Sequence, residues 1–149
     1  MIVVDASVFV KLFKAEDDTR VARAFVDHLL DHNLPFVAPS VVLYESLSAA
    51  LHIGHSFATV GELFDRLRQF GLRIEEPSMG ELARAELIAT TVVPGGGYPT
   101  LFDCIYHAMA IERGGVFVTA DRRHATRTVQ FGHVAALADW MTAVTPPHP

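Results

Sequence analysis

The fold is decided by residues 101–123, which read LFDCIYHAMAIERGGVFVTADRR. Apolar side chains such as Ile105 and Met109 recur at helical spacing, and the glycine pair at 114–115 predicts the end of that helix, because a left-handed residue commonly ends one. The run Val-Phe-Val at 116–118 is continuously apolar, which is typical of a strand covered on both faces. The stretch therefore predicts a helix followed by a buried strand.

Acidic side chains mark the ends of this unit, and the start of the chain repeats the arrangement. Asp103 lies at the beginning of the helix and Asp121 just beyond the strand, while the apolar residues 2–4 are followed by Asp5 and Ser7. Ligands of open parallel sheets bind beyond the carboxyl ends of the strands, so Asp5 and Asp121 are candidate site residues. Each of these aspartates also occupies a position where an ordinary helix cap is common.

Length and composition limit the possible classes of protein. We expect the 149 residues to form one domain (1–149) with a sizeable core, ending in a polar, proline-rich tail at 145–149. No apolar stretch approaches the ~18 residues of a membrane span, and the single cysteine, Cys104, suits a reducing compartment, so we expect a cytoplasmic protein without membrane contact. The net charge of −5 does not indicate nucleic-acid binding, although a local basic surface is compatible with it.

Strands and helices alternate along the whole chain. Strands are predicted at 2–4, 36–38, 72–74, 116–118 and around 133–135, and helices at 8–14, 21–30, 41–51, 57–70, 82–91, 101–113 and from 122. Ser40 and Ser78 are predicted to cap the helices that follow them. This order predicts a three-layer α/β/α fold with a mainly parallel sheet.

Glu45 is the most unusual acid, because it is the only charged residue in a helix that is otherwise apolar or small. A lone carboxylate in such surroundings is costly unless it has a partner. No lysine or arginine lies in this helix, so Glu45 either serves a site or forms a long-range salt bridge.

A functional cluster becomes the stronger interpretation when Asp5, Glu45, Asp103 and Asp121 are considered together. Carboxylates brought within several ångströms raise one another's pKa, so such a cluster either takes up protons or recruits a cation. Oxygen ligands of this kind suit Mg²⁺ or Mn²⁺, which also bind substrate phosphates. The expected chemistry is metal-assisted displacement at a phosphodiester.

The same ordered pattern resembles a known family. Its pieces are IVVDAS at 2–7, Glu45, FDCIYHAMA at 102–110 and VFVTADRR at 116–123. This pattern resembles PIN-domain ribonucleases, and especially the VapC toxins of bacterial and archaeal toxin–antitoxin pairs. The resemblance implies a parallel five-stranded sheet between helices, an RNA substrate and a cognate, VapB-like antitoxin that covers the site. It further implies that the catalytic, metal-binding acids are Asp5, Glu45, Asp103 and Asp121, supported by the hydroxyls of Ser7 and Thr119.

Two features depart from that family pattern. The loop around Gly95–Gly97 is richer in glycine than the family leads us to expect, and it is either a lid or a tolerated insertion, with the insertion favoured. His124 occupies a position where an apolar residue is common.

Further residues are candidates for contact with RNA or with a protein partner. Lys11, Arg122, Arg123 and Arg127 would lie near the rim and could contact RNA phosphates, with a solvated helix face as the alternative. His107, one helical turn beyond Asp103, is a candidate for contact with the site, and a packed core position is its alternative. The apolar surface of the helices between 41 and 67 predicts a homodimer or a groove for a partner helix, and ordinary core packing is its alternative.

Two other functions remain open from the residues alone. A haloacid-dehalogenase-like phosphatase would need a second aspartate two residues beyond Asp5, where this chain has Ser7. A non-catalytic domain could instead bind a cation in the acidic pocket and use its apolar helices for protein partners.

Overall fold

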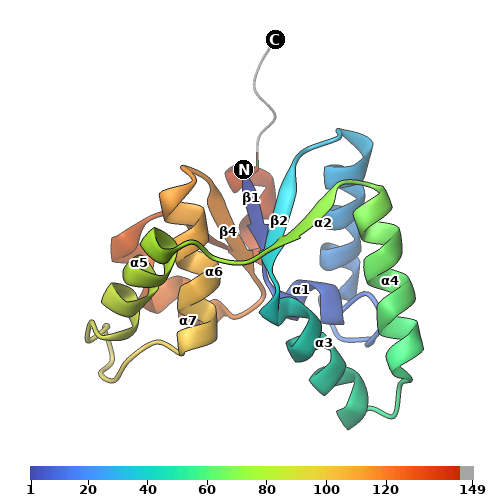
Figure 1. Ribbon diagram of the computed structural model, residues 1–149, viewed down its shortest axis with the longest axis horizontal. Coiled ribbons are helices and arrows are strands. Elements are labelled where there is room, and N and C mark those ends of the chain that lie inside the picture. The colour runs from blue at the N-terminus through green and yellow to red at the C-terminus, as the bar shows by residue number, and fades with distance from the viewer. Residues whose placement is uncertain (145–149) are drawn as a thin grey trace.

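The computed structural model describes residues 1–144, so the proline-rich tail expected at 145–149 lies outside the described residues. Five parallel strands form one sheet in the order β3-β2-β1-β4-β5 (Figure 1). Their bounds are β1 Ile2–Val4, β2 Phe36–Pro39, β3 Leu72–Glu75, β4 Val116–Thr119 and β5 Val134–Ala136. The predicted parallel sheet is confirmed, and all five strands lie where the sequence placed them to within two residues.

Helices cover both faces of the sheet. They are α1 Ala6–Val10, α2 Thr19–Asp31, α3 Val41–His52, α4 Phe57–Gln69, α5 Met79–Ala89, α6 Leu101–Glu112, α7 Arg122–Arg127 and α8 Trp140–Ala143, with short 3-10 turns at Val129–Phe131 and Leu137–Asp139. Helices α5 and α6 lie on one side of the sheet and α2, α3 and α4 on the other (Figure 1), which gives the predicted three layers. Among residues 1–144, no helix combines the length and the apolar character needed to cross a membrane.

The core fixes α6 against the central strands. Val3 of β1 pairs with Phe117 of β4, both are fully buried, and Tyr106 of α6 stacks on Phe117 with ring centroids 5.5 Å apart. Gly115 passes so close to the first residue that an added Cβ would lie 2.1 Å from the carbonyl oxygen of Met1. Because only glycine fits there, the turn from α6 into β4 is held against the start of β1. This packing sets where the acids at the other end of α6 and β1 lie.

Some local predictions need correction. Ser40 has helical dihedral angles and makes no capping bond, so its predicted cap is wrong, whereas Ser78 forms a complete capping box with Glu81. Helix α1 ends at Val10 rather than at Lys14, because the chain continues in turns, in which the N–H groups of Leu12 and Phe13 donate to carbonyls three residues earlier. Helix α8 was not predicted from the sequence.

Candidate active site

Asp5 follows β1 directly and is 4% exposed. Its Oδ2 accepts hydrogen bonds from Ser7 Oγ at 2.6 Å and Thr119 Oγ1 at 2.5 Å, and it makes no helix-capping bond. Burial raises the pKa of Asp5 to about 6; the two hydroxyls oppose that shift and the charge of Asp103 adds to it. Asp5 is thus a buried carboxyl held in place by neutral donors, not a cap.

The same two hydroxyls connect the ends of β1 and β4. The backbone N–H of Ala120 donates to Ser7 Oγ at 3.0 Å, and the N–H of Asp121 donates to Thr119 Oγ1 at 2.9 Å. Each hydroxyl therefore accepts from the chain after β4 and donates to Asp5, so the positions of Asp5 and Asp121 are coupled through hydrogen bonds.

Glu45 projects from the middle of α3 and is half-buried. Its Oε2 accepts a hydrogen bond of 2.6 Å from the hydroxyl of Tyr106, a residue to which sequence reasoning assigned no role. Burial raises the pKa of Glu45 to about 7, and the charges of Asp5 and Asp103 raise it further against the opposing Tyr106 bond. Glu45 makes no salt bridge with any residue between 1 and 144, so the long-range ion pair considered as its alternative role is absent there.

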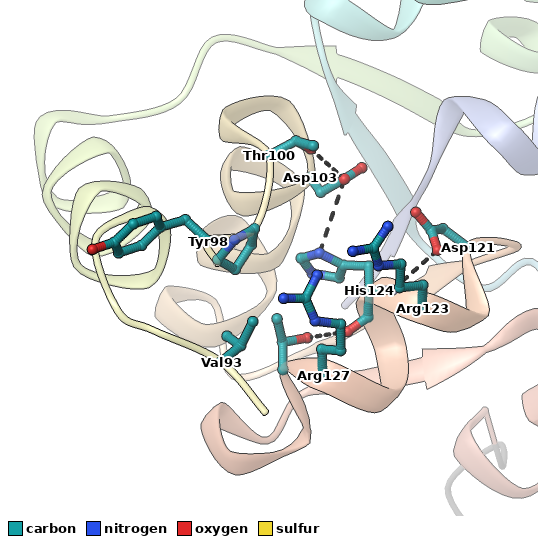
Figure 2. Close-up of a pocket in the computed structure, with 10 residues that line it drawn as sticks. Val93, Tyr98, Thr100, Asp103, Asp121, Arg123, His124 and Arg127 are labelled. Carbon is teal, nitrogen blue, oxygen red and sulfur yellow. Dashed lines mark hydrogen bonds and ion pairs between the residues drawn. The ribbon is translucent and has the colours of Figure 1, made fainter. Parts of the chain in front are cut away.

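Asp103 and Asp121 face each other across the start of α6 and α7 (Figure 2). Asp103 Oδ2 accepts from the Thr100 hydroxyl, so the two side chains bond to each other and do not form a capping box. Burial raises the pKa of Asp103, and the charge of Asp121 adds to the increase. Asp121 does cap a helix, because its Oδ1 accepts from the N–H of His124 at 3.0 Å, but the residue remains exposed.

The four acids interact electrostatically as one group. The charge of Asp103 acts on Asp5 and on Glu45, and the charge of Asp121 acts on Asp103. In the described part of the chain, no lysine or arginine lies within 4.0 Å of any of these carboxylates. Three buried or half-buried acids with raised pKa and no cationic partner form a site whose negative charge is not neutralised by the protein.

Oxygen donors without a basic partner fit a hard divalent cation in chemical type. Mg²⁺ commonly takes one or two carboxylates and completes its shell with water and substrate phosphate. Within residues 1–144, no three His, Cys, Asp or Glu side chains are grouped so as to hold a metal ion. The carboxylates of Asp5, Glu45, Asp103 and Asp121 would be the residues that hold such an ion.

The four basic residues expected near the rim lie in different surroundings, and one of them, Arg127, donates to the backbone carbonyls of Pro94 and Gly96. Lys11 is buried, and its Nζ forms ion pairs with Glu16 and with Asp18, the latter at 2.7 Å. Arg122 and Arg123 are exposed on α7 and make no salt bridge with the described residues. A phosphate would have to compete with two carboxylates for Lys11, whereas Arg122 and Arg123 are available to solvent.

His107 is fully buried, and its Nε2 lies 2.7 Å from the carbonyl oxygen of Gly132. It is thus a packed core histidine bonded to the backbone. Its Nδ1 lies 3.3 Å from Nε2 of His124, and Nδ1 of His124 lies 3.9 Å from Oδ2 of Asp103. Burial lowers the pKa of both histidines to about 4. His107 therefore reaches the acids only through His124, whose position the sequence marked only as a departure from the family pattern.

The apolar surface predicted between residues 41 and 67 is divided. Phe64 and Leu67 belong to the core, whereas Leu51 and Phe57 are exposed. Beside Glu45, a largely apolar groove runs along α3 to the first turn of α6; its lining residues are Val41, Tyr44, Glu45, Ser48, Ala49, His52 and Phe102. An apolar groove thus adjoins the acidic site directly.

Comparison with known structures supports the same fold. A search of curated proteins finds no match, whereas 18 chains of solved structures match. The sarcin-ricin loop cleaving toxin VapC20 of Mycobacterium tuberculosis has a TM-score of 0.58 at 20% identity, covering 76% of this chain and 84% of that one. FitAcB of Neisseria gonorrhoeae has a TM-score of 0.58 at 20% identity, covering 94% and 99%. FitAB bound to the IR36 DNA fragment has a TM-score of 0.60 at 19% identity, covering 99% and 100%.

The strongest assignment comes from the sequence family. The family described as PIN domain matches residues 2–129, which is most of the chain and includes all four acids. This match, together with the parallel sheet and its order, shows that the chain belongs to the PIN domain family.

Proposed function

We propose that this protein is a Mg²⁺- or Mn²⁺-dependent endoribonuclease and the toxin of a toxin–antitoxin pair. The observation that carries the proposal is the group formed by Asp5, Glu45, Asp103 and Asp121, which has no lysine or arginine partner in the described residues. Membership of the PIN domain family and the similarity to VapC20, described as a sarcin-ricin loop cleaving toxin, support the reaction class. The whole chain, 1–149, would act as one domain in the cytoplasm.

The acids would hold the cation and the surrounding side chains would hold the acids. A divalent ion bound there supplies charge stabilisation and an activated water for phosphodiester hydrolysis. Ser7 and Thr119 fix the orientation of the Asp5 carboxyl, and Tyr106 does the same for Glu45. Burial raises the pKa of Glu45 to about 7, and a cation bound beside it would favour the ionised carboxylate.

Substrate binding would rely on local cations despite the net charge of −5. Arg122 and Arg123 are exposed beside Asp121 and can contact phosphates of the RNA strand. Lys11 would contribute only if a phosphate displaced Glu16 or Asp18 from it.

The apolar groove along α3 is a candidate binding surface for an antitoxin. Tyr44 and Phe102 are 70% and 50% exposed, so the groove offers apolar surface to a helix of an antitoxin, which would then cover Glu45. The exposed Leu51 and Phe57 offer a separate apolar surface on α3 and α4 for a homodimer.

The test is cleavage of a mixed RNA pool with Mg²⁺, Mn²⁺ or EDTA, comparing the wild-type protein with Asp5→Asn. Asparagine keeps an oxygen that accepts from Ser7 and Thr119, so the variant should fold while its cleavage is lost. A DNA pool of the same sequences belongs in the assay, because one of the similar complexes is bound to DNA. Full metal-dependent cleavage by Asp5→Asn would rule out the proposal. Induced expression of Asp103→Ala beside the wild type tests growth arrest in the same way.

The alternatives predict different results. No observation favours the phosphatase, because the position two residues beyond Asp5 carries Ser7, which donates to Asp5. A protein that gains thermal stability with Mg²⁺ but never cuts either pool would instead be a non-catalytic cation-binding domain.

A further inference from the structure

A second pocket is lined by Asp103 and Asp121 but not by Glu45. The loop between α5 and α6 forms one wall with Val93, Pro99 and Thr100, and α7 forms the other with Arg123, His124 and Arg127 (Figure 2). The volume of this pocket is about 170 Å³. A cavity of about 150 Å³ in another protein holds one benzene molecule, so this space is suited to one planar ring system.

The glycine-rich loop at Gly95–Gly97 lies between residues of this wall, Val93 and Pro99, and has a defined backbone conformation. Gly95, Gly96 and Gly97 have φ values of +88°, +82° and +76°, which side-chain-bearing residues rarely adopt. The N–H of Val93 donates to Gly97 O at 3.2 Å, and the N–H of Gly96 donates to Val93 O at 2.9 Å. The loop thus closes on itself by hydrogen bonds that need three successive glycines.

Arg127 ties this loop to α7. Its Nε donates to Pro94 O at 3.1 Å, and its Nη2 donates to Gly96 O. The guanidinium of Arg127 is therefore occupied by backbone carbonyls, and the outer wall of the pocket depends on it. Arg123, by contrast, is exposed beside the same pocket and makes no ion pair within residues 1–144.

The hydrogen bonds beneath the pocket determine which nitrogen of His124 is an acceptor. A carbonyl only accepts, so Nε2 of His107 carries a proton toward Gly132 O, and Nδ1 of a neutral His107 must accept from Nε2 of His124. Nδ1 of a neutral His124 is then left with a lone pair, 3.9 Å from Oδ2 of Asp103, which is also an acceptor. This separation is too long for a direct hydrogen bond. A donor with two hydrogens that approaches from the pocket to about 2.9 Å from each atom could donate one hydrogen to each.

We propose that this pocket binds one unpaired nucleobase of the RNA strand next to the cleaved phosphodiester and recognises its exocyclic amino group through Nδ1 of His124. The inference rests on the proposed ribonuclease function, because the base belongs to its substrate. Adenine, cytosine and guanine carry such an amino donor and uracil does not. Arg123 contacts a phosphate adjacent to that base, and the loop held by Arg127 closes over it.

The experiment first maps the cleaved phosphodiester of an RNA oligonucleotide. It then compares substrates that carry adenosine, or purine riboside, which lacks the amino group, at the nucleotides on either side of that bond. The wild-type protein should cleave the adenosine substrate roughly fivefold faster, since one neutral hydrogen bond contributes about 1 kcal/mol. His124→Phe should lose the discrimination, and His124→Asn, which keeps an acceptor oxygen, should recover part of it. Arg127→Gln should weaken it by releasing the loop. Arg23→Gln, on the exposed face of α2, is the matched control and should leave it unchanged.

A second readout does not require cleavage. In EDTA, adenosine 5′-monophosphate should shift the backbone amide resonances of Thr100 and His124, and purine riboside 5′-monophosphate should shift them less. These shifts in a protein that never cuts RNA would support the pocket and overturn the ribonuclease. Cleavage with equal rates for both bases, or with the same discrimination in His124→Phe, would overturn the pocket and leave the ribonuclease. If the protein neither cuts RNA nor shows these resonance shifts, both the pocket and the ribonuclease are overturned.

Discussion

The two ends of helix α6 meet carboxylates in opposite ways. At its start, Asp103 interacts with Asp5, Glu45 and Asp121, and no described lysine or arginine neutralises them. Just past its end, Arg113 donates from Nη1 to Glu75 and from Nε to Glu81, both at 2.5 Å. An arginine thus neutralises the acids near the end of α6, whereas the acids near its start have no lysine or arginine partner among the described residues.

The pKa values follow this difference. Burial acts to raise the pKa of Glu81, but its bonds with Arg113 and Ser78 outweigh burial, and the pKa lies below the ordinary value. Burial also raises the pKa of Asp103, and there the nearby charge of Asp121 adds to the effect. Burial alone therefore does not distinguish a structural acid from a functional one; the presence or absence of a cationic partner does.

The largest expected difference between the two ends is in cleavage. Asp103→Asn should lower metal-dependent RNA cleavage by at least roughly 10²–10³-fold, because it removes the negative charge of one of the four carboxylates proposed to hold the catalytic cation. Glu81→Gln, the matched change at the other end, should leave cleavage per folded molecule within about twofold of wild type. Initial rates on one oligonucleotide measure both. Equal losses in the two variants would break the comparison.

For the free energy of unfolding, a change near the end of α6 should matter more than a change near its start. Arg113→Met leaves the largely buried Glu81 without its partner, which should lower the free energy of unfolding by about 3 kcal/mol. Asp103→Asn should leave it unchanged or slightly higher in metal-free buffer, because an acid with a raised pKa opposes folding when ionised. Urea unfolding with EDTA present checks both. A larger loss in Asp103→Asn would show that the site acids stabilise the fold.

Metal binding should stabilise only through the acids that lack a partner. At a concentration of Mg²⁺ about 100 times its Kd, the wild type should gain about 2.7 kcal/mol, or roughly 5–10 °C in Tm. Glu81→Gln should gain the same increment from its lower starting point, and Asp5→Asn should gain little. Thermal unfolding by circular dichroism measures these shifts, and an equal gain in Asp5→Asn would place the ion elsewhere.

The stability of the fold should also depend on pH. Folded Asp5 keeps its proton up to about pH 6, against an ordinary pKa of 3.8, so the folded state holds more protons and Asp5 contributes a loss of stability as pH rises through that window. The pKa of His107 and of His124 is lowered from 6.5 to about 4, so these residues act in the opposite direction. Between these pH values the unfolded chain binds more protons than the folded state does, and their contribution to stability rises with pH. The two effects partly cancel in the wild type.

Asp5→Asn separates these effects. The variant lacks the Asp5 contribution, so its stability relative to wild type should rise between pH 4 and pH 7 by roughly 1–3 kcal/mol in EDTA. Urea unfolding at both pH values measures the change. A flat difference would mean that Asp5 ionises in the folded state as easily as in the unfolded chain.

Much of the fold was predictable because its signals are local. The apolar runs at β1 and β4 and the capping box at Ser78 are short patterns, and the structure confirms them. The Ser40 cap was wrong because its dihedral angles already belong to the helix, which a sequence pattern does not reveal. Strand topology placed Asp5 and Asp121 at one edge of the sheet, because parallel strands end there, whereas Glu45 and Asp103 lie on helices and were grouped with them through the family resemblance.

The details around those acids were not predictable because they depend on contacts between distant residues. Tyr106 reaches Glu45 across 61 positions in the sequence. The bond from Thr119 to Asp5 spans 114 positions, and only the family resemblance pointed to that hydroxyl. The two carboxylates that occupy Lys11 lie close in sequence, but the choice of partner depends on how residues 11–18 turn. The bond from Arg127 to the glycine-rich loop spans 31 positions, and no local pattern marks it.

The most direct test of the central claim is Mn²⁺ binding measured by electron paramagnetic resonance without RNA. The signal of free Mn²⁺ should fall when wild-type protein or Glu81→Gln is added, and it should remain when Asp5→Asn/Asp103→Asn is added. If the wild type leaves the signal unchanged, or the double variant removes it as fully as the wild type does, the acids at the start of α6 do not form the metal site.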